Sequence, residues 1–462
     1  MPKFLARLRD RLTSGDAVGR VFRNAGKLLA GTTAAALLGL GSNVLAARRL
    51  GPEAYGFLVL LSTFLFAVVF GLLSFQSWQA IIHYGAKTLV DRREADLKRL
   101  VKFGFILDGA TSIVAVAIGA GAVFLYGRSK GWDPALLTPA TISSAGLFLR
   151  LTGTSVAVLR LFNRFDLLAF QQAAAAAVRL LVVAFLFVRG AALTGFLYGW
   201  LATEIAGHAL LTALALVEIR RRGVRGLGRE PLRGLTTTFP GLWKFLLTTN
   251  LYGTTRLGAR ELDIMIVGGV LGPAAAGLFK IVRQFARAVG RLDDVARQAI
   301  YPDLSKTWAR RDTRRFGELI RGPALILGGA GFVVWVGFLL FGRPVLNGTV
   351  GPAYAAAYGP ILIYLVGVMI AMATFHFQSV LLAMGRPGEL FRVTAGTTLA
   401  YFAVLFFLVR SHEVLGAASA YVAYQALWSA WLGVAIRNRR RFAAKAEEKP
   451  AETPSFEDVI AG

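Results

Sequence analysis

LGPEAYGF at residues 50–57 and LGPAAAGL at residues 271–278 are two copies of one motif, 221 positions apart. Each copy follows one apolar segment and opens the next. In such a turn the first glycine ends a helix, the proline sets the backbone angle of the next one, and the second glycine allows another segment to approach closely. Because the shift is about half of the chain, the sequence predicts a duplication into two halves related by a pseudo-two-fold axis.

The composition is typical of a protein that spans a membrane many times. Of 462 residues, 55% are hydrophobic and 17% are charged, and the mean hydropathy is +0.57. The formal net charge is +26, but the basic residues lie between long apolar segments, which is the pattern of a polytopic membrane protein. The absence of cysteine excludes disulfides, thiolate metal sites and cysteine nucleophiles, and four scattered histidines argue against a histidine metal centre.

Twelve segments match the length of roughly 20 apolar residues that a bilayer core requires. Two of them, 246–271 and 277–302, contain arginines and are assigned because the repeat maps the first spans onto them. We therefore expect an all-α polytopic membrane protein with about twelve transmembrane helices in two pseudo-symmetric six-helix bundles. The predicted spans are residues 28–47, 56–78, 103–126, 139–160, 168–188, 192–217, 246–271, 277–302, 323–342, 357–384, 390–409 and 414–436.

The basic residues in the connections predict the orientation. The segments on the side of the N-terminus hold 35 lysines and arginines, and those on the opposite side hold seven. By the positive-inside rule both termini are cytoplasmic, and the predicted location is the bacterial inner membrane. The expected parts are a basic N-terminus (1–27), the first bundle (28–219), a basic linker (220–240), the second bundle (241–436) and a tail (437–462).

The two motif copies carry a family resemblance. Together with LDIMIVGG at residues 262–269, they resemble the oligosaccharide flippase family, which handles O-antigen and polysaccharide precursors, of the multidrug/oligosaccharidyl-lipid/polysaccharide exporter superfamily. The resemblance covers residues 20–436 and rests on structural turns, so it identifies the family better than the substrate. It implies a flippase that moves a polyprenyl-diphosphate-linked oligosaccharide to the outer leaflet by alternating access, for lipopolysaccharide or exopolysaccharide synthesis.

Basic residues inside the predicted spans indicate a binding site. In span 277–302 the helical period places five charged residues within about 80° of arc. Four cations facing lipid would cost on the order of 10 kcal/mol, so this face is expected to contact water or an anion. The five residues are Lys280, Arg283, Arg287, Arg291 and Asp294.

Span 246–271 adds Arg256, Arg260 and Asp263 on one face, and a tight turn joins it to the span above. The corresponding positions of the first two spans are uncharged, so the basic face is predicted in the second half alone. Arginine suits a diphosphate because it makes bidentate contacts to phosphate oxygens. The alternative is an internal salt-bridge network, whose acidic members would be Asp108, Glu204, Asp263, Asp293 and Asp294.

Further intramembrane groups are candidates for the cavity and for ion coupling. Arg150, beside Thr152 and Thr154, is a further cavity candidate for substrate binding. Glu204 and His208 lie four residues apart on one helical face and form a potential titrating pair. The candidates that would carry protons or hold sodium are Asp108, Glu204, His208, Asp263 and His376.

The sequence predicts a transporter without an enzymatic activity, a metal or a cofactor. There is no Gly-Lys-Ser/Thr phosphate loop and no spacing that supports catalysis. The expected partners are the lipid-linked oligosaccharide, membrane lipids and the polymerase or export proteins of the same pathway, with no nucleic acid. The alternatives are a peptidoglycan-precursor flippase, a drug/cation antiporter of the same superfamily, a glycolipid-processing membrane enzyme and a non-transporting scaffold subunit.

Overall fold

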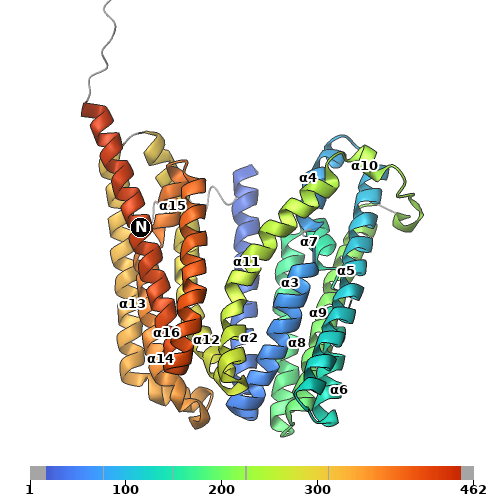
Figure 1. The fold of residues 1–462 in the computed structure, drawn as a ribbon. Coiled ribbons are helices and arrows are strands. Elements are labelled where there is room, and N and C mark those ends of the chain that lie inside the picture. The colour runs from blue at the N-terminus through green and yellow to red at the C-terminus, as the bar shows by residue number, and fades with distance from the viewer. Residues whose placement is uncertain (1–16, 76, 149, 224–225, 311, 449–462) are drawn as a thin grey trace, which may run out of the picture. The chain divides into compact units, whose positions relative to one another are not determined.

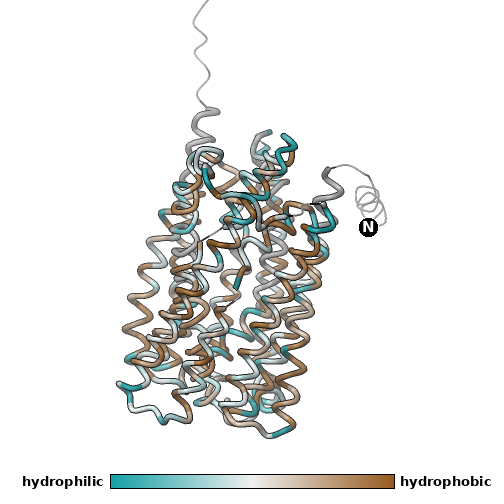
Figure 2. The backbone as a smooth tube through the Cα atoms, turned by 90° about the vertical axis from the view of Figure 1, so that its right-hand side faces the viewer, coloured by the Kyte–Doolittle hydropathy of each residue, from teal (hydrophilic) through white to brown (hydrophobic). Residues whose placement is uncertain are grey.

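The computed structural model describes residues 17–448 except 76, 149, 224–225 and 311. Side chains are described for these residues apart from 17–25, 27, 229, 251–260, 291–299, 301–302, 305–306, 309, 313, 387 and 438–448. Within this part of the chain the regular structure is entirely helical, and it contains no strand. The apolar residues lie along the helices, and many of the hydrophilic ones lie near their ends (Figure 2).

The first half of the chain begins with a long helix that continues through a π-helical segment, η1, into a short helix, α3 (Figure 1). The helices of this half are α2 (Ala17–Ser62), η1 (Thr63–Val69), α3 (Phe70–Leu73), α4 (Ser77–Val90), α5 (Glu94–Ser129), α6 (Pro134–Ile142), η2 (Ser143–Leu147), α7 (Thr152–Leu161), α8 (Phe165–Val188), α9 (Leu193–Arg221), η3 (Leu227–Arg229) and α10 (Leu235–Thr238).

The second half has fewer and longer helices. They are α11 (Leu242–Leu271), α12 (Pro273–Ala309), α13 (Thr313–Thr349), η4 (Pro352–Ala357), α14 (Tyr358–Ala373), α15 (His376–Ala383) and α16 (Pro387–Glu448).

The described helices account for twelve membrane passes. Eight segments are long and apolar enough to cross a membrane. One of these, Leu28–Leu73, contains 46 residues and is interrupted by the non-helical Gly51. Another, Gly388–Arg437, contains 50 residues and is interrupted by the non-helical His412 and Glu413. Each is long enough for two passes, one on either side of its interruption. The charged helices α11 and α12 complete the twelve, which confirms the predicted fold class.

Two spans are interrupted where the sequence predicts continuous helices. The second span leaves helical geometry at Ser74, whose ψ angle is 122°, and continues as α4 to Val90, beyond the predicted end at residue 78. The fourth span leaves it at Phe148, whose ψ angle is 147°, and resumes at Thr152. Neither break contains a proline, so the local sequence gives no reason for it. Side chains from other helices stabilise both breaks.

The described residues divide into two compact units. The first contains the chain up to Lys280 together with Asn347–Tyr354, and the second contains Ile281–Leu346 and the chain from Ala355. In the first unit α5, α6, α8 and α9 stand side by side, and α2 packs along α8 (Figure 1). Its core joins α4, α5, α7, α9 and α11 through fully buried side chains, among them Ile81, Leu100, Val158, Leu211 and Leu242.

The second unit has a core of its own. Leu304 of α12, Phe316 of α13, Val380 of α15 and Leu432 of α16 are buried in one cluster. Outward-facing residues of α13, such as Leu325 and Val333, are 77% and 69% exposed. Large apolar side chains on the outside of a helix are expected where the surrounding solvent is lipid.

The two motif copies meet inside the first unit. Gly51 and Gly272 both have positive φ angles, 73° and 91°, which glycine adopts without strain. A Cβ atom on Gly56 would lie 1.7 Å from the carbonyl oxygen of Pro273, and one on Gly277 would lie 2.3 Å from that of Pro52. The contact is reciprocal, as a two-fold relation between the copies requires, and we call it the glycine contact.

The segment Asn347–Tyr354 packs beside the first motif copy. The Nη1 atom of Arg48 donates a hydrogen bond to the carbonyl oxygen of Gly348 at 2.8 Å. The ring of Tyr354 meets that of Tyr55 edge-on with a centroid distance of 6.5 Å, and both residues are fully buried. The hydroxyl of Tyr55 donates to Oδ1 of Asn43 at 3.2 Å. These contacts fix the turn against a segment about 300 residues away.

Candidate functional site

Arg179, Glu204 and His208 meet between α8 and α9, and Arg150, in the break before α7, lies within electrostatic range of Glu204. Arg179 of α8 donates from Nη2 to Oε1 of Glu204 at 2.5 Å, and from Nε to the hydroxyl of Thr203 at 3.4 Å. Nε2 of His208 lies 3.3 Å from the other carboxylate oxygen of Glu204. Arg150 also interacts electrostatically with Glu204. We call Arg150, Arg179, Glu204 and His208 the charge centre.

Aromatic rings hold both arginines of the charge centre. The guanidinium carbon of Arg150 lies 4.3 Å from the ring centroid of Phe70 and 5.2 Å from that of Phe66. That of Arg179 lies 5.0 Å from the ring of Trp200. Arg150 reaches Phe66 and Phe70 because it sits in the break of the fourth span, opposite the π-helical part of the second. Such stacking uses the face of the guanidinium and leaves the hydrogen-bond donors at its edge.

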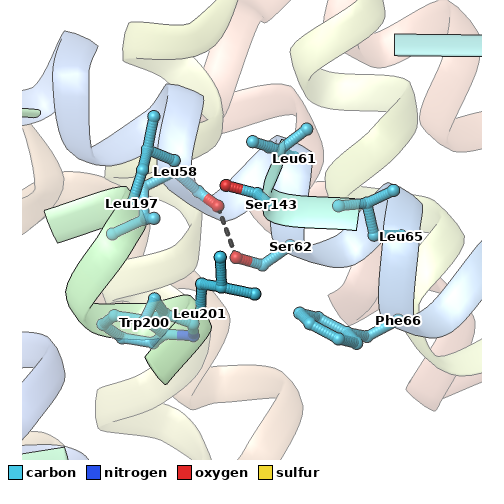
Figure 3. A pocket seen from close by; sticks show the side chains of 9 residues that line it. All are labelled: Leu58, Leu61, Ser62, Leu65, Phe66, Ser143, Leu197, Trp200 and Leu201. Carbon is cyan, nitrogen blue, oxygen red and sulfur yellow. Dashed lines mark hydrogen bonds between the residues drawn. The ribbon is translucent and has the colours of Figure 1, made fainter. Parts of the chain in front are cut away.

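A small cavity adjoins these rings (Figure 3). Its volume is ≈ 10 Å³, about the room that one water molecule needs. Phe66 and Trp200, on which the two arginines stack, both line it, and the hydroxyl of Ser62 donates to the carbonyl oxygen of Leu58 beside it. The remaining lining is Leu61, Leu65, Ser143, Leu197 and Leu201.

Asp108 of α5 connects the two helix breaks. Its Oδ1 atom accepts a hydrogen bond from the hydroxyl of Ser77, the first residue of α4, at 2.7 Å. Its Oδ2 atom accepts from the backbone N–H of Thr154, in the first turn of α7, at 2.7 Å. A carboxylate is stabilised at a helix N-terminus, where backbone N–H groups lack helical partners. In this structure Asp108, 7% exposed, joins three helices.

Three basic residues of α12 have described side chains. Arg283 is 5% exposed, Lys280 is half-buried and Arg287 is exposed. The side chains of Arg256, Arg260 and Arg291 lie outside the described residues, as do those of Asp293 and Asp294. Asp263 of α11 is 5% exposed, and its carboxylate accepts from the backbone N–H of Ile264 at 2.8 Å. Substrate binding by this basic face stays a prediction.

The structure brings together residues that the sequence predicts in different roles. Arg150, Glu204 and His208 share the charge centre, whereas Asp108 lies at the helix junction. Arg179 is not among the predicted site residues, although opposite charges in two neighbouring spans are a signal for pairing. The described part of the first half has two arginines in its interior, Arg150 and Arg179, and the sequence predicts the first of them as a cavity residue.

No group of three or more histidine, aspartate or glutamate side chains in the described part of the chain is arranged to hold a metal ion. The charge centre offers hydrogen bonding and charge through two guanidinium groups, one carboxylate and one imidazole.

Comparison with known proteins agrees with the predicted resemblance. Residues 44–358 match the family model described as polysaccharide biosynthesis protein. Inner membrane protein YghQ of Escherichia coli (strain K12) is 29% identical over 342 residues, which cover 73% of this chain and 94% of that protein.

Solved structures show the same fold. A multidrug resistance MATE family transporter of the MOP superfamily, in an inward-facing conformation, aligns with a TM-score of 0.65 and 14% identity, covering 89% of this chain and 96% of that one. Lipid II flippase MurJ, in an inward closed conformation, aligns with a TM-score of 0.63 and 14% identity, covering 89% and 87%. The chain belongs to the polysaccharide biosynthesis protein family.

Proposed function

We propose that the protein is a flippase that moves a polyprenyl-diphosphate-linked oligosaccharide from the cytoplasmic to the outer leaflet of a bacterial inner membrane. The observation that carries the proposal is the family match over residues 44–358, on a fold shared with transporters and a lipid flippase. The inner membrane location is supported by the name of the relative YghQ. The distribution of basic residues supports cytoplasmic termini.

The proposed mechanism is alternating access. The bundles of residues 28–219 and 241–436 rock against each other and expose the headgroup site first to one side of the membrane and then to the other. The basic face of α11 and α12 would bind the diphosphate. It consists of Lys280, Arg283 and Arg287, with Arg256, Arg260 and Arg291 by helical spacing. A basic face favours an anionic headgroup and disfavours the cationic substrates of a drug antiporter.

The test is transport by the purified chain in proteoliposomes. A fluorescent oligosaccharide on a polyprenyl diphosphate is placed in both leaflets, and a membrane-impermeant quencher reports the fraction that becomes accessible with time. We expect protein-dependent movement of this lipid, recovered chemically unchanged, as a transporter without enzymatic activity requires. Protein-free vesicles and heat-inactivated protein are the controls.

Parallel vesicles separate the alternatives. One set contains the lipid-linked peptidoglycan precursor, and another contains a cationic dye whose efflux is measured. If the peptidoglycan precursor or the dye moves faster than the oligosaccharide lipid, that compound is the better candidate substrate. If the glycan is recovered shortened or elongated, the protein is a glycolipid-processing enzyme instead.

A further inference from the structure

The segment Asn347–Tyr354 connects two helices of the second unit but packs within the first. The chain on both sides of it, up to Leu346 and from Ala355, belongs to the second unit. It contains the last residues of α13 and the start of η4, and it lies in the predicted external connection between spans 323–342 and 357–384. We call Asn347–Tyr354 the external segment. Because the chain continues from it into α13 and α14, any movement of these helices away from the first bundle acts directly on its contacts.

Arg48 binds the C-terminus of α13 within the external segment. Its Nη1 atom donates to the carbonyl oxygen of Gly348 at 2.8 Å and to that of Thr349, the last residue of α13, at 3.4 Å. The last carbonyl groups of a helix lack helical partners and carry partial negative charge, so a guanidinium group is a favourable partner for them. The bonds are exposed to solvent, and exposed bonds of this kind are weak enough to break and form again in each transport cycle.

The neighbouring arginine, Arg49, forms the same kind of bond inside the first bundle. Its Nη2 atom donates to the carbonyl oxygen of Gly190, which follows the C-terminal end of α8. Both α2 and α8 belong to the first bundle, so this bond does not depend on movement between the bundles. Two adjacent arginines therefore share one chemistry, and of the two, Arg48 is the one bonded to the external segment.

Tyr354, at the end of the external segment, opposes the packed arrangement. Its side chain is fully buried and meets the ring of Tyr55 in α2 edge-on. The hydroxyl of Tyr55 donates to Asn43, whereas the hydroxyl of Tyr354 is buried and has no hydrogen-bond partner among the described residues. An unpaired buried hydroxyl destabilises the state that buries it, and water pairs with the same hydroxyl once it is exposed. Separation of the external segment from α2 thus relieves a cost of packing.

We propose that Arg48 and Tyr354 together set the equilibrium between a closed and an open external side. Arg48 stabilises the closed side through the carbonyl groups of α13, and the unpaired hydroxyl of Tyr354 destabilises it. The inference rests on the proposed function, because the external segment separates from α2 when the alternating-access cycle opens the headgroup site to the outside. Both are positioning residues, since neither is placed at the substrate. Two opposing contributions of similar size keep the states close in free energy, so that a transporter populates both.

The separation can be measured with a single introduced thiol, because the chain contains no cysteine. Val350 of the external segment is 1% exposed, so Val350→Cys is expected to react with a membrane-impermeant maleimide in intact cells only while the segment is detached. Adding Arg48→Gln should raise the labelling rate about threefold or more, because the closed side loses a charge-assisted hydrogen bond. Adding Tyr354→Phe should lower the rate about threefold or more, because the unpaired hydroxyl is gone.

Matched variants show whether the effect belongs to the external segment. Arg49→Gln removes the equivalent bond to Gly190 and should leave the labelling of Val350→Cys unchanged. Arg48→Lys keeps the charge and a donor, so its labelling rate should lie between those of the unsubstituted reporter and of Arg48→Gln. A second reporter, Ala140→Cys in α6 of the first bundle, replaces a fully buried side chain, and its slow labelling should be the same with and without Arg48→Gln.

The proposal is wrong if Arg48→Gln does not raise the labelling rate of Val350→Cys, or raises that of Ala140→Cys by the same factor. It is also wrong if Arg49→Gln has the same effect as Arg48→Gln, or if Tyr354→Phe does not lower the rate. This outcome is separable from that of the proposed function. Transport of the oligosaccharide lipid by a chain whose labelling is insensitive to both substitutions would leave the flippase standing and remove this role. Opposite labelling changes in a chain that does not move this lipid would leave the role standing and remove the proposed substrate.

Discussion

At the scale of single residues, Asp108 shows how a buried charge can be structural. Sequence reasoning makes it a candidate for ion coupling, and that role stays a prediction. The structure gives its carboxylate two partners, the hydroxyl of Ser77 and the N–H of Thr154. Each partner stands at the start of a helix that resumes after a break, so the loss of Asp108 would leave both helix starts without their acceptor.

We expect Asp108→Ala to lower the free energy of unfolding by about 2–4 kcal/mol, because it leaves two buried donors unpaired. Ser77→Ala removes one hydroxyl and one hydrogen bond, and should cost about 0.5–1.5 kcal/mol. Thermal unfolding of the purified protein in detergent ranks the two variants. An Asp108→Ala protein as stable as the wild type, but with altered ion dependence of transport, would favour the coupling role instead.

Arg287 tests the basic face of α12. Charge reversal by Arg287→Glu is expected to slow transport of the oligosaccharide lipid at least about tenfold, since it replaces attraction for a diphosphate with repulsion. The variant should still insert into the membrane, because Arg287 is exposed. Arg314→Glu, at a side chain that is 92% exposed before the next span, is the control. Equal transport by both variants would remove Arg287 from the site.

At the scale of elements, the glycine contact explains why the motif needs its second glycine. A side chain on Gly56 or Gly277 would collide with main-chain atoms, which cannot move aside as a flexible side chain does. We expect Gly56→Ala to lower the free energy of unfolding by about 1–3 kcal/mol, as overpacking does.

Gly39 of α2 provides the matched control, because a Cβ atom there would meet nothing within 4 Å. Gly39→Ala should leave the free energy of unfolding unchanged or raise it by up to about 1 kcal/mol, since alanine favours the helix. Chemical unfolding of both variants in detergent measures the difference. Similar stabilities for the two would mean that the motif copies do not touch in solution.

The sequence predicts the spans better than the breaks within them. Hydropathy, the basic loops and the internal repeat together predict twelve passes, because lipid requires a similar length of every spanning helix. The break at Phe148–Leu151 is different, since its residues contain no proline and it depends on Asp108, which is 46 positions before Thr154. The pairing of Arg179 with Glu204 likewise needs the packing of α8 on α9, and no local pattern gives the distance between them.

At the scale of the whole molecule, the predicted topology can be tested directly because the chain has no cysteine. We expect Arg128→Cys and Arg410→Cys to react with a membrane-impermeant maleimide in intact cells, since both residues are exposed and lie in predicted external loops. Arg222→Cys and Arg314→Cys should react only after the membrane is permeabilised. If Arg222→Cys is labelled in intact cells, either the predicted orientation or the predicted number of passes before residue 222 is wrong.

The glycine contact has a consequence for how the molecule responds to its surroundings. The atoms that meet at the glycine contact belong to the main chain and carry no ionisable group, so a change in pH or ionic strength does not act on them directly. If binding or protonation separates the two turns, it must therefore act on other groups. Movement of the helices that the turns connect would then transmit the effect to the glycine contact.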